Sequence, residues 1–163
     1  MSGEHPILLC YDGSDGAKEA IEVAGRLFGG GHAVVLNVVE SLSPAVFYGA
    51  KGDATFPPTE DVPLHVPSLE TGRRVAREGV AAAQTAGFDA SPLVDITPHG
   101  TSHRIAEIAD EYEAAAIVVG ARGLSTLKSI VLGSTCHELV QHARCPVLVV
   151  HRNREGTDIG ERE

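Results

Sequence analysis

The feature that most constrains the fold is a regular alternation of short, continuously apolar runs with longer segments whose apolar residues recur at helical spacing. Runs that are apolar on both faces are typical of strands in a parallel sheet covered on both sides. Such runs occupy residues 6–11, 33–39, 92–96, 114–119 and 146–150. The segments with helical spacing are about residues 17–28, 69–86, 101–112 and 134–142. Strand and helix in alternation predict an α/β fold, an open five-stranded parallel sheet in three layers.

Turn and capping residues mark where these helices begin and end. Asp12-Gly-Ser-Asp15 supplies turn and N-cap chemistry before the first helix, and Gly29–Gly31 ends it. Thr101 or Ser102 is expected to cap the third helix, and Ser134 or Thr135 to open the last one. The buried face of the third helix is expected to consist of Ile105, Ile108, Ala109 and Tyr112.

The length of 163 residues favours a single domain, which we expect over residues 1–151. Residues 40–67 form a long insertion with five prolines, and they read as a lid, a partner-binding insertion or a variable loop. The polar stretch 152–163 is expected to be a C-terminal tail.

Charge and cysteine content exclude several classes of function. The formal net charge of −9 argues against a broad nucleic-acid or anionic-membrane surface. No apolar run approaches the roughly 20 residues that span a bilayer, and the N-terminus lacks the basic region of a signal peptide. Three cysteines without a CxxC pair suit a reduced compartment, so we expect a cytoplasmic protein.

The segment GARGLSTLKSIVLGST, residues 120–135, follows the fourth strand directly. Ligands of parallel sheets bind at the carboxyl ends of the strands, where Asp12 and Val38 also fall. The segment carries glycines, which let the main chain approach a ligand, and two basic residues without an acid. It ends at a helix N-terminus, which favours anions. The segment is therefore either a surface loop or a phosphate cradle, and the combination favours the cradle.

Neither GxxxxGK[ST] nor GxGxxG occurs, so the common phosphate loop and dinucleotide motif are disfavoured. The glycines instead read Gly120-x2-Gly123-x9-Gly133-Ser134. This spacing resembles the nucleotide motif of the universal stress protein family, in its ATP-binding branch. PILLCYDGSDGAKEAIEVA is similar to the first strand, acidic turn and helix of that family, and HELVQHARCPVLVV to its closing helix and strand. With VVLNVVE and AAAIVVGARG, the resemblance covers about residues 6–151.

The resemblance implies a Rossmann-like fold, similar to the adenine nucleotide alpha hydrolases, with ATP held across the strand ends. Asp12 would meet the ribose hydroxyls, and Tyr11 and Val38 would border the adenine. The ribose and phosphates would lie along residues of two glycine-containing stretches: Gly120, Arg122, Gly123, Gly133, Ser134 and Thr135. Tyr11 is bulkier than the small residue that the family often has there, which predicts a narrowed or reshaped adenine pocket.

The resemblance also implies Mg²⁺ bridging the phosphates, and a homodimer formed through the last strand, Val147 to Val150. Cys145, just before that strand, either cross-links such a dimer or packs as a reduced thiol. His99 and His103 lack a third ligand, so we expect no metal site built from protein side chains alone.

The leading hypothesis is an ATP-binding stress-response sensor or regulator, with an unknown regulatory protein partner. No residue of the phosphate segment stands out as a general base, so any ATP hydrolysis is expected to be slow. Three alternatives remain: an ATP hydrolase or phosphotransferase, a cyclic AMP-binding protein, and a nucleotide-free interaction module.

Overall fold

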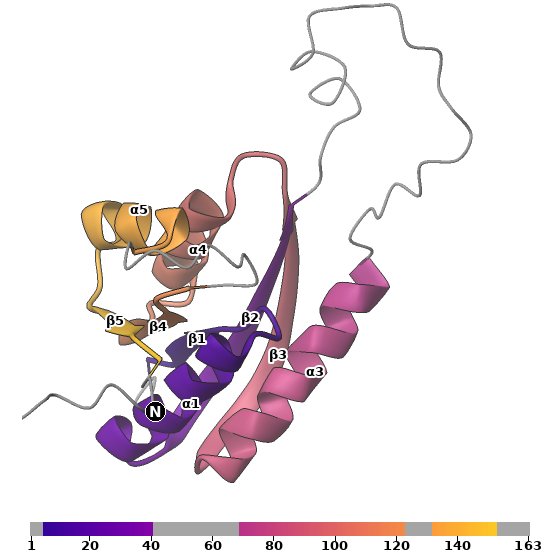
Figure 1. Cartoon of the computed structure of the whole chain (residues 1–163), viewed down its shortest axis with the longest axis vertical. Helices are drawn as coiled ribbons and strands as arrows, with labels where there is room; N and C mark the ends of the chain where they lie inside the picture. The colour runs from indigo at the N-terminus through magenta and orange to yellow at the C-terminus, as the bar shows by residue number, and fades with distance from the viewer. Residues whose placement is uncertain (1–4, 41–68, 123–131, 153–163) are drawn as a thin grey trace, which may run out of the picture.

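The computed structural model describes residues 5–40, 69–122 and 132–152 of the chain. The expected insertion and tail lie outside these residues, except for Glu40 and Arg152. Gly123 also lies outside them, as does Lys128, which with Arg122 makes up the two basic residues of segment 120–135. The described elements alternate along the chain (Figure 1): β1 (Ile7–Cys10), α1 (Asp15–Phe28), β2 (Gly31–Glu40), α3 (Leu69–Thr85), β3 (Phe88–Thr97), α4 (Thr101–Glu111), β4 (Ala116–Gly120), α5 (Ser134–His142) and β5 (Val147–Val150).

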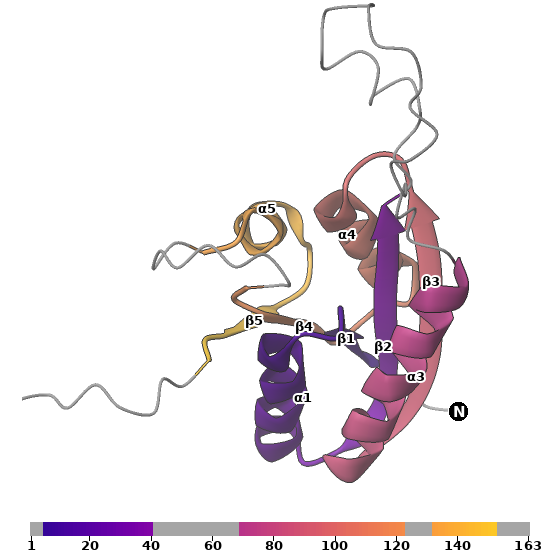
Figure 2. The same ribbon diagram turned by 45° about the vertical axis from the view of Figure 1, so that its right-hand side comes forward.

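The five strands form one parallel sheet in the order β3-β2-β1-β4-β5. Helices α1 and α3 cover one face of the sheet, and α4 and α5 cover the other (Figures 1 and 2). Two cores result, one under each helix pair, and alternate residues of β1 contribute to each: Leu9 to the α1/α3 core and Leu8 to the α4/α5 core. The expected three-layer α/β fold is confirmed.

Strand order reverses at the centre of the sheet. From β1 the chain moves outward through β2 to β3, then returns to β4 on the other side of β1 and ends at β5. The helices that follow β1 and β4, α1 and α5, therefore lie on opposite faces of the sheet. Parallel sheets of this kind bind ligands at the carboxyl ends of the strands, next to such a reversal.

The third strand is longer than the sequence pattern indicated. It begins at Phe88, and it pairs with β2 along its full length, from Gly31↔Phe88 to Glu40↔Thr97. Because β3 is an edge strand, many of its side chains are exposed or only half-buried, and its first half reads as polar. An apolar run is therefore a poor guide to where such a strand begins.

Two expectations about helix α4 were wrong. Its N-cap is Gly100, with φ +95°, and neither Thr101 nor Ser102 caps the helix, because both hydroxyls bond to carboxylates of other elements. Tyr112 is the C-cap residue and is 42% exposed, whereas Ile105, Ile108 and Ala109 are buried as expected. The apolar spacing continues past the end of the helix, so it does not reveal that Tyr112 turns outward.

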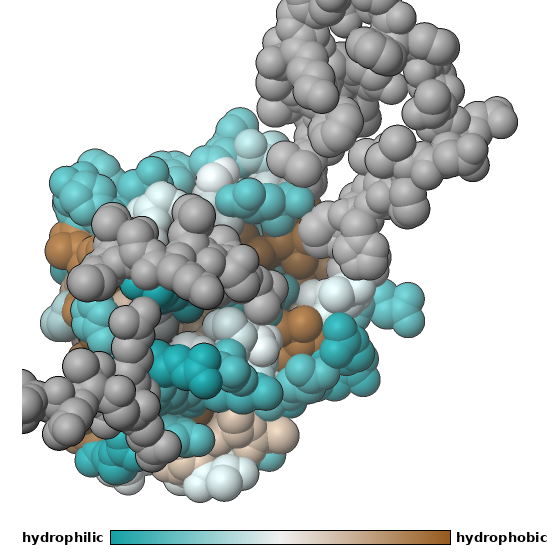
Figure 3. All heavy atoms as spheres, viewed as in Figure 1, coloured by the Kyte–Doolittle hydropathy of each residue, from teal (hydrophilic) through white to brown (hydrophobic). Residues whose placement is uncertain are grey.

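The described surface seen in Figure 3 is mainly hydrophilic, with small separate apolar areas. Within the described residues, no helix is long and apolar enough to cross a membrane.

Candidate functional site: a cavity at the carboxyl edge of the sheet

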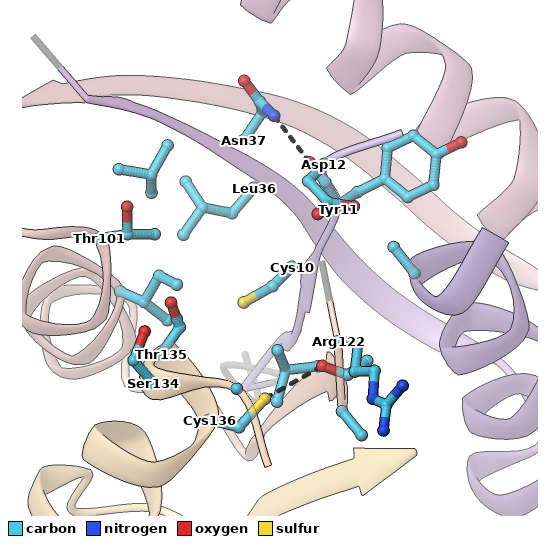
Figure 4. A pocket seen from close by; sticks show the side chains of 17 residues that line it. Cys10, Tyr11, Asp12, Leu36, Asn37, Thr101, Arg122, Ser134, Thr135 and Cys136 are labelled. Carbon is cyan, nitrogen blue, oxygen red and sulfur yellow. Dashed lines mark hydrogen bonds between the residues drawn. The ribbon is translucent and has the colours of Figure 1, made fainter. Parts of the chain in front are cut away.

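A cavity lies at the carboxyl ends of the central strands (Figure 4). Strands β1, β2 and β4 form its floor, and the first turns of α4 and α5 form its walls on one side of the sheet. The described lining residues are Cys10, Tyr11, Asp12, Ala17, Leu36, Asn37, Val38, Thr101, Ile105, Val119, Gly120, Ala121, Arg122, Gly133, Ser134, Thr135 and Cys136.

The cavity brings together residues that the sequence places near opposite ends of the domain. Gly123 lies outside the described residues, and the other candidate site residues all line this one cavity: Tyr11, Asp12, Val38, Gly120, Arg122, Gly133, Ser134 and Thr135. Their convergence follows from the parallel sheet, which gathers the carboxyl ends of its strands at one edge.

Asp12 is the only carboxylate among the described residues that line the cavity. Its Oδ1 accepts a hydrogen bond from the amide of Ser14 at 2.9 Å, which holds the turn between β1 and α1. Among the described residues no group donates to its second oxygen. That oxygen is able to accept a hydrogen bond from a hydroxyl in the cavity.

Tyr11 directs its ring away from the cavity (Figure 4). The ring packs against helix α3, where a Cβ on Gly79 would lie 2.7 Å from its Cδ1. Burial raises the pKa of the Tyr11 hydroxyl, and the charge of Glu78 raises it further. The ring therefore belongs to the core under α1 and α3 and does not narrow the cavity, contrary to the expectation from its size.

Asn37 is a lining residue that the sequence analysis did not single out. Its side chain is buried, and its Nδ2 donates to the carbonyl of Tyr11 at 2.8 Å. This bond fixes the end of β1 next to Asp12. A signal was present in the sequence, because an asparagine interrupts the apolar run VVLNVV, and a buried amide needs hydrogen-bond partners.

The three helices that contribute residues to the cavity, α1, α4 and α5, differ in how their N-termini are capped. Ser14 caps α1 by accepting from the amide of Ala17, and Asp15 adds a negative charge in the first turn. The carboxylate of Glu40 accepts from the amide of Thr101 at the start of α4. Among the described residues no side chain caps helix α5, and its first turn contains no acidic residue. Its positive end therefore stays available for an anion.

The hydroxyl groups of Ser134 and Thr135 belong to this uncapped first turn, with Ser134 as the first helical residue, as expected. Both side chains lie on the cavity side of α5 (Figure 4). Together with the amides of the turn, they form a compact group of hydrogen-bond donors. A phosphate group is a suitable acceptor for such a set.

The two described glycines of the motif, Gly120 and Gly133, differ in how closely other main-chain atoms surround them. A Cβ on Gly120 would lie 2.9 Å from the carbonyl carbon and oxygen of Gly16, so the glycine lets helix α1 approach the end of β4. Gly133 has an ordinary φ of −58°, and its amide donates to the carbonyl of Ala121 at 3.1 Å. That amide is thus already bonded, and the donors open to a ligand begin at Ser134.

Arg122 lines the cavity, but Figure 4 shows its guanidinium directed away from Ser134 and Thr135. In this arrangement the positive charge lies apart from the first turn of α5. The described donors next to that turn are therefore neutral hydroxyls and main-chain amides.

The cysteines behave as neutral thiols. Burial raises the pKa of Cys10 and of Cys136, both of which line the cavity, and that of the half-buried Cys145. The Sγ of Cys136 donates to the carbonyl of Gly120 at 3.0 Å, joining α5 to the end of β4. In the described part of the chain no group of three or more His, Cys, Asp or Glu residues is placed to hold a metal ion.

Comparison with known proteins gives consistent results. Residues 4–151 match the model of the universal stress protein family. A Thermus aquaticus protein named "Universal stress protein in QAH/OAS sulfhydrylase 3'region" is 35% identical over 144 residues, 88% of this chain and 96% of the relative.

Two solved structures share the fold. The universal stress protein from Archaeoglobus fulgidus in complex with dAMP has a TM-score of 0.58 and 19% identity, over 89% of this chain and 96% of that one. A universal stress protein in complex with cAMP has a TM-score of 0.60 and 23% identity, over 92% of this chain and 99% of the other.

Proposed function

This chain belongs to the universal stress protein family, and on that premise we propose that its cavity binds an adenine nucleotide, with ATP as the main ligand. The observation that carries the proposal is the convergence of Asp12 and the uncapped first turn of α5 on one cavity. The similar proteins solved with dAMP and cAMP add support from the same fold.

The two ends of the cavity suggest an orientation for the nucleotide. The Asp12 oxygen to which no described group donates accepts from a ribose hydroxyl, and the main chain at Tyr11 and Val38 borders the adenine. The phosphates extend toward the amides and hydroxyls of Ser134 and Thr135. Gly123 is proposed to follow the phosphates as the resemblance implies.

Mg²⁺ fits this arrangement only as an ion bridging the phosphates. The described residues contain no cluster of protein ligands for a metal, but Mg²⁺ commonly keeps its waters and binds through substrate phosphates. The hydroxyl oxygens of Ser134 and Thr135 are the described groups at the phosphate end that suit such an ion.

The site favours holding a nucleotide over cleaving it. Asp12 is the only carboxylate among the described lining residues, and it lies at the proposed nucleoside end. A general base for hydrolysis would have to reach a water at the terminal phosphate. We therefore propose a nucleotide-dependent regulator of a stress response, with slow hydrolysis at most. Three free thiols suit a cytoplasmic location.

Isothermal titration of the protein with ATP and Mg²⁺ tests this proposal, with Asp12→Asn as the key variant. Asparagine keeps an oxygen that accepts from Ser14, but it replaces the second carboxylate oxygen with a donor. We expect binding of ATP to weaken by about 10- to 100-fold, the loss of one charge-assisted hydrogen bond.

Asp15→Asn is the matched control, because Asp15 is an exposed carboxylate of the same turn that does not line the cavity. It is expected to bind ATP within about twofold of the wild type. Failure of the wild-type protein to bind ATP, AMP, dAMP or cAMP would falsify the proposal. Tighter binding of cAMP than of ATP would replace ATP by the cyclic nucleotide.

We also propose a homodimer formed through β5. Within the described residues, β5 ends the sheet and only one of its sides is paired, with β4. The main-chain groups of Pro146 and Val150 bond to β4, so the alternation of a strand turns those of Val147 and Val149 toward the open side. An open apolar edge of this kind readily pairs with a second strand.

Val149→Pro is expected to convert the dimer to a monomer, measured by sedimentation equilibrium. Proline removes an amide that faces the open edge and leaves the bonds to β4 in place. A thermal melt close to that of the wild type is the check that the domain stays folded. A wild-type protein that sediments as a monomer at all concentrations would rule out the dimer.

A further inference from the structure

The first turn of α4 is tied to two other elements by carboxylates. Glu40, at the end of β2, accepts from the amide of Thr101 at 3.1 Å and from its hydroxyl at 2.6 Å. Glu138, in the second turn of α5, accepts from the hydroxyl of Ser102. Neighbouring residues of one helix thus bond in opposite directions, one to the sheet and one to the facing helix.

The second of these bonds joins the two walls of the cavity. Helix α4 contributes Thr101 and Ile105 to the lining, and α5 contributes Ser134 and Thr135. Ser102 is only 7% exposed, and it directly follows the lining residue Thr101 on α4. The bond links the first turn of α4 to the second turn of α5, and the described apolar side chains of the two helices pack in the same core.

We infer that Ser102 and Glu138 are positioning residues for the phosphate end of the ligand. This inference rests on the proposed nucleotide site and goes beyond it by assigning residues that do not touch the ligand. The bond ties the second turn of α5 to α4, and because the helix is short and continuous it also limits how far the first turn of α5 can shift. The amides and hydroxyls of Ser134 and Thr135 therefore stay where the phosphates need them.

The physical argument is the steep dependence of hydrogen bonding on geometry. Several donors that converge on one phosphate lose strength together when their helix shifts, because both the distances and the angles change. The adenosine end depends on Asp12 and on the ends of β1 and β2, which this bond does not hold. A loosened α5 should weaken binding of phosphates and leave binding of the nucleoside unchanged.

The bond also fixes the direction of the Glu138 charge. A carboxylate bonded to Ser102 lies at the first turn of α4, where a negative charge is favourable. Released from Ser102, the same carboxylate is free to approach the phosphate site on its own helix and to repel the ligand. Loss of Ser102 therefore combines a geometric effect and an electrostatic effect, and variants of Glu138 separate them.

The test is isothermal titration of the full chain with ATP and with adenosine. Ser102→Ala removes the bond and releases the Glu138 charge, and it is expected to weaken ATP binding about tenfold. Glu138→Ala removes both the bond and the charge, so it is expected to weaken ATP binding less, by about fivefold. In both variants adenosine binding is expected to stay within about twofold of the wild type. Glu138→Gln keeps an oxygen that accepts from Ser102, so it is expected to retain wild-type ATP binding. Glu107→Gln, an exposed carboxylate on α4 outside the cavity, is the surface-charge control.

The results of these titrations separate a failure of this inference from a failure of the proposed function. Equal loss of ATP and adenosine binding in Ser102→Ala would indicate a general loss of structure. Unchanged ATP binding in the same variant would show that the bond does not position the phosphate end of the site. Either result overturns the inference while the nucleotide site stands. If the wild-type protein binds neither ligand, both proposals fall. Thermal melts of each variant establish that the titrated protein is folded.

Discussion

Replacing Gly120 with alanine is expected to lower the free energy of unfolding by about 3 kcal/mol, at the upper end of the usual cost of overpacking. The new Cβ would lie 2.9 Å from the carbonyl carbon and oxygen of Gly16 and 3.2 Å from the amide nitrogen of Ala17. These are main-chain atoms in the first turn of α1, so they cannot move aside as a side chain would. Relief requires α1 to move away from the end of β4, which also displaces the turn that holds Asp12. Urea unfolding followed by circular dichroism measures the effect.

Gly133→Ala is the matched control, because it changes the second described glycine of the same sequence motif. Its φ of −58° suits alanine, and among the described residues its Cβ would meet only the carbonyl oxygen of Ala121, at 3.2 Å. We expect a loss of about 1 kcal/mol or less, in the range of an N-cap change from glycine to alanine. Equal losses at Gly120 and Gly133 would show that the packing of α1 on β4 does not explain the first glycine.

Replacing Leu139 with alanine is expected to lower the free energy of unfolding by about 2–5 kcal/mol, the range for truncating a buried leucine to alanine and leaving a cavity. Leu139 is fully buried and is the largest side chain by which α5 packs on the sheet, beside Cys136. The loss should therefore fall on the helix that carries the proposed phosphate donors. Guanidinium unfolding gives the stability, and titration with ATP gives the weakened binding.

Val140 offers the control for this change, since it is the next residue on α5 and is 56% exposed. Val140→Ala removes apolar atoms from the same helix without opening a cavity, and it is expected to stay within about 0.5 kcal/mol of the wild type. A similar loss at both positions would mean that the burial of Leu139 does not anchor α5.

The fold could be predicted from the sequence because its strands are either buried on both faces or bounded by clear turn signals. The runs at β1, β2 and β4 are almost uninterrupted in apolar residues, and the helix between β1 and β2 has a cap at Ser14 and a glycine at its end. The pattern failed where one face of an element meets water. The start of β3 and the end of α4 at Tyr112 both lie at such places.

The candidate site could be located from the sequence, but the directions of its side chains could not. In a run such as ILLCYD every residue is apolar before Asp12, so the pattern does not reveal that Cys10 faces the cavity and Tyr11 faces α3. Asn37, Glu40 and Glu138 act through partners that are distant in the sequence. Which residues these partners are is decided by the packing of the elements, not by any local pattern.

The position of β1 in the sheet determines which parts of the fold can form while the chain is still being synthesised. Strand β1 pairs on one side with β2, which follows it closely, and on the other with β4, which the ribosome delivers only after α3, β3 and α4. The β1–β2–β3 half of the sheet is free to form while synthesis continues, but the cavity lacks a wall until α5 emerges. If the nucleotide binds as proposed, through both Asp12 and α5, it binds only the completed domain, and mass action then stabilises the finished fold over every shorter one.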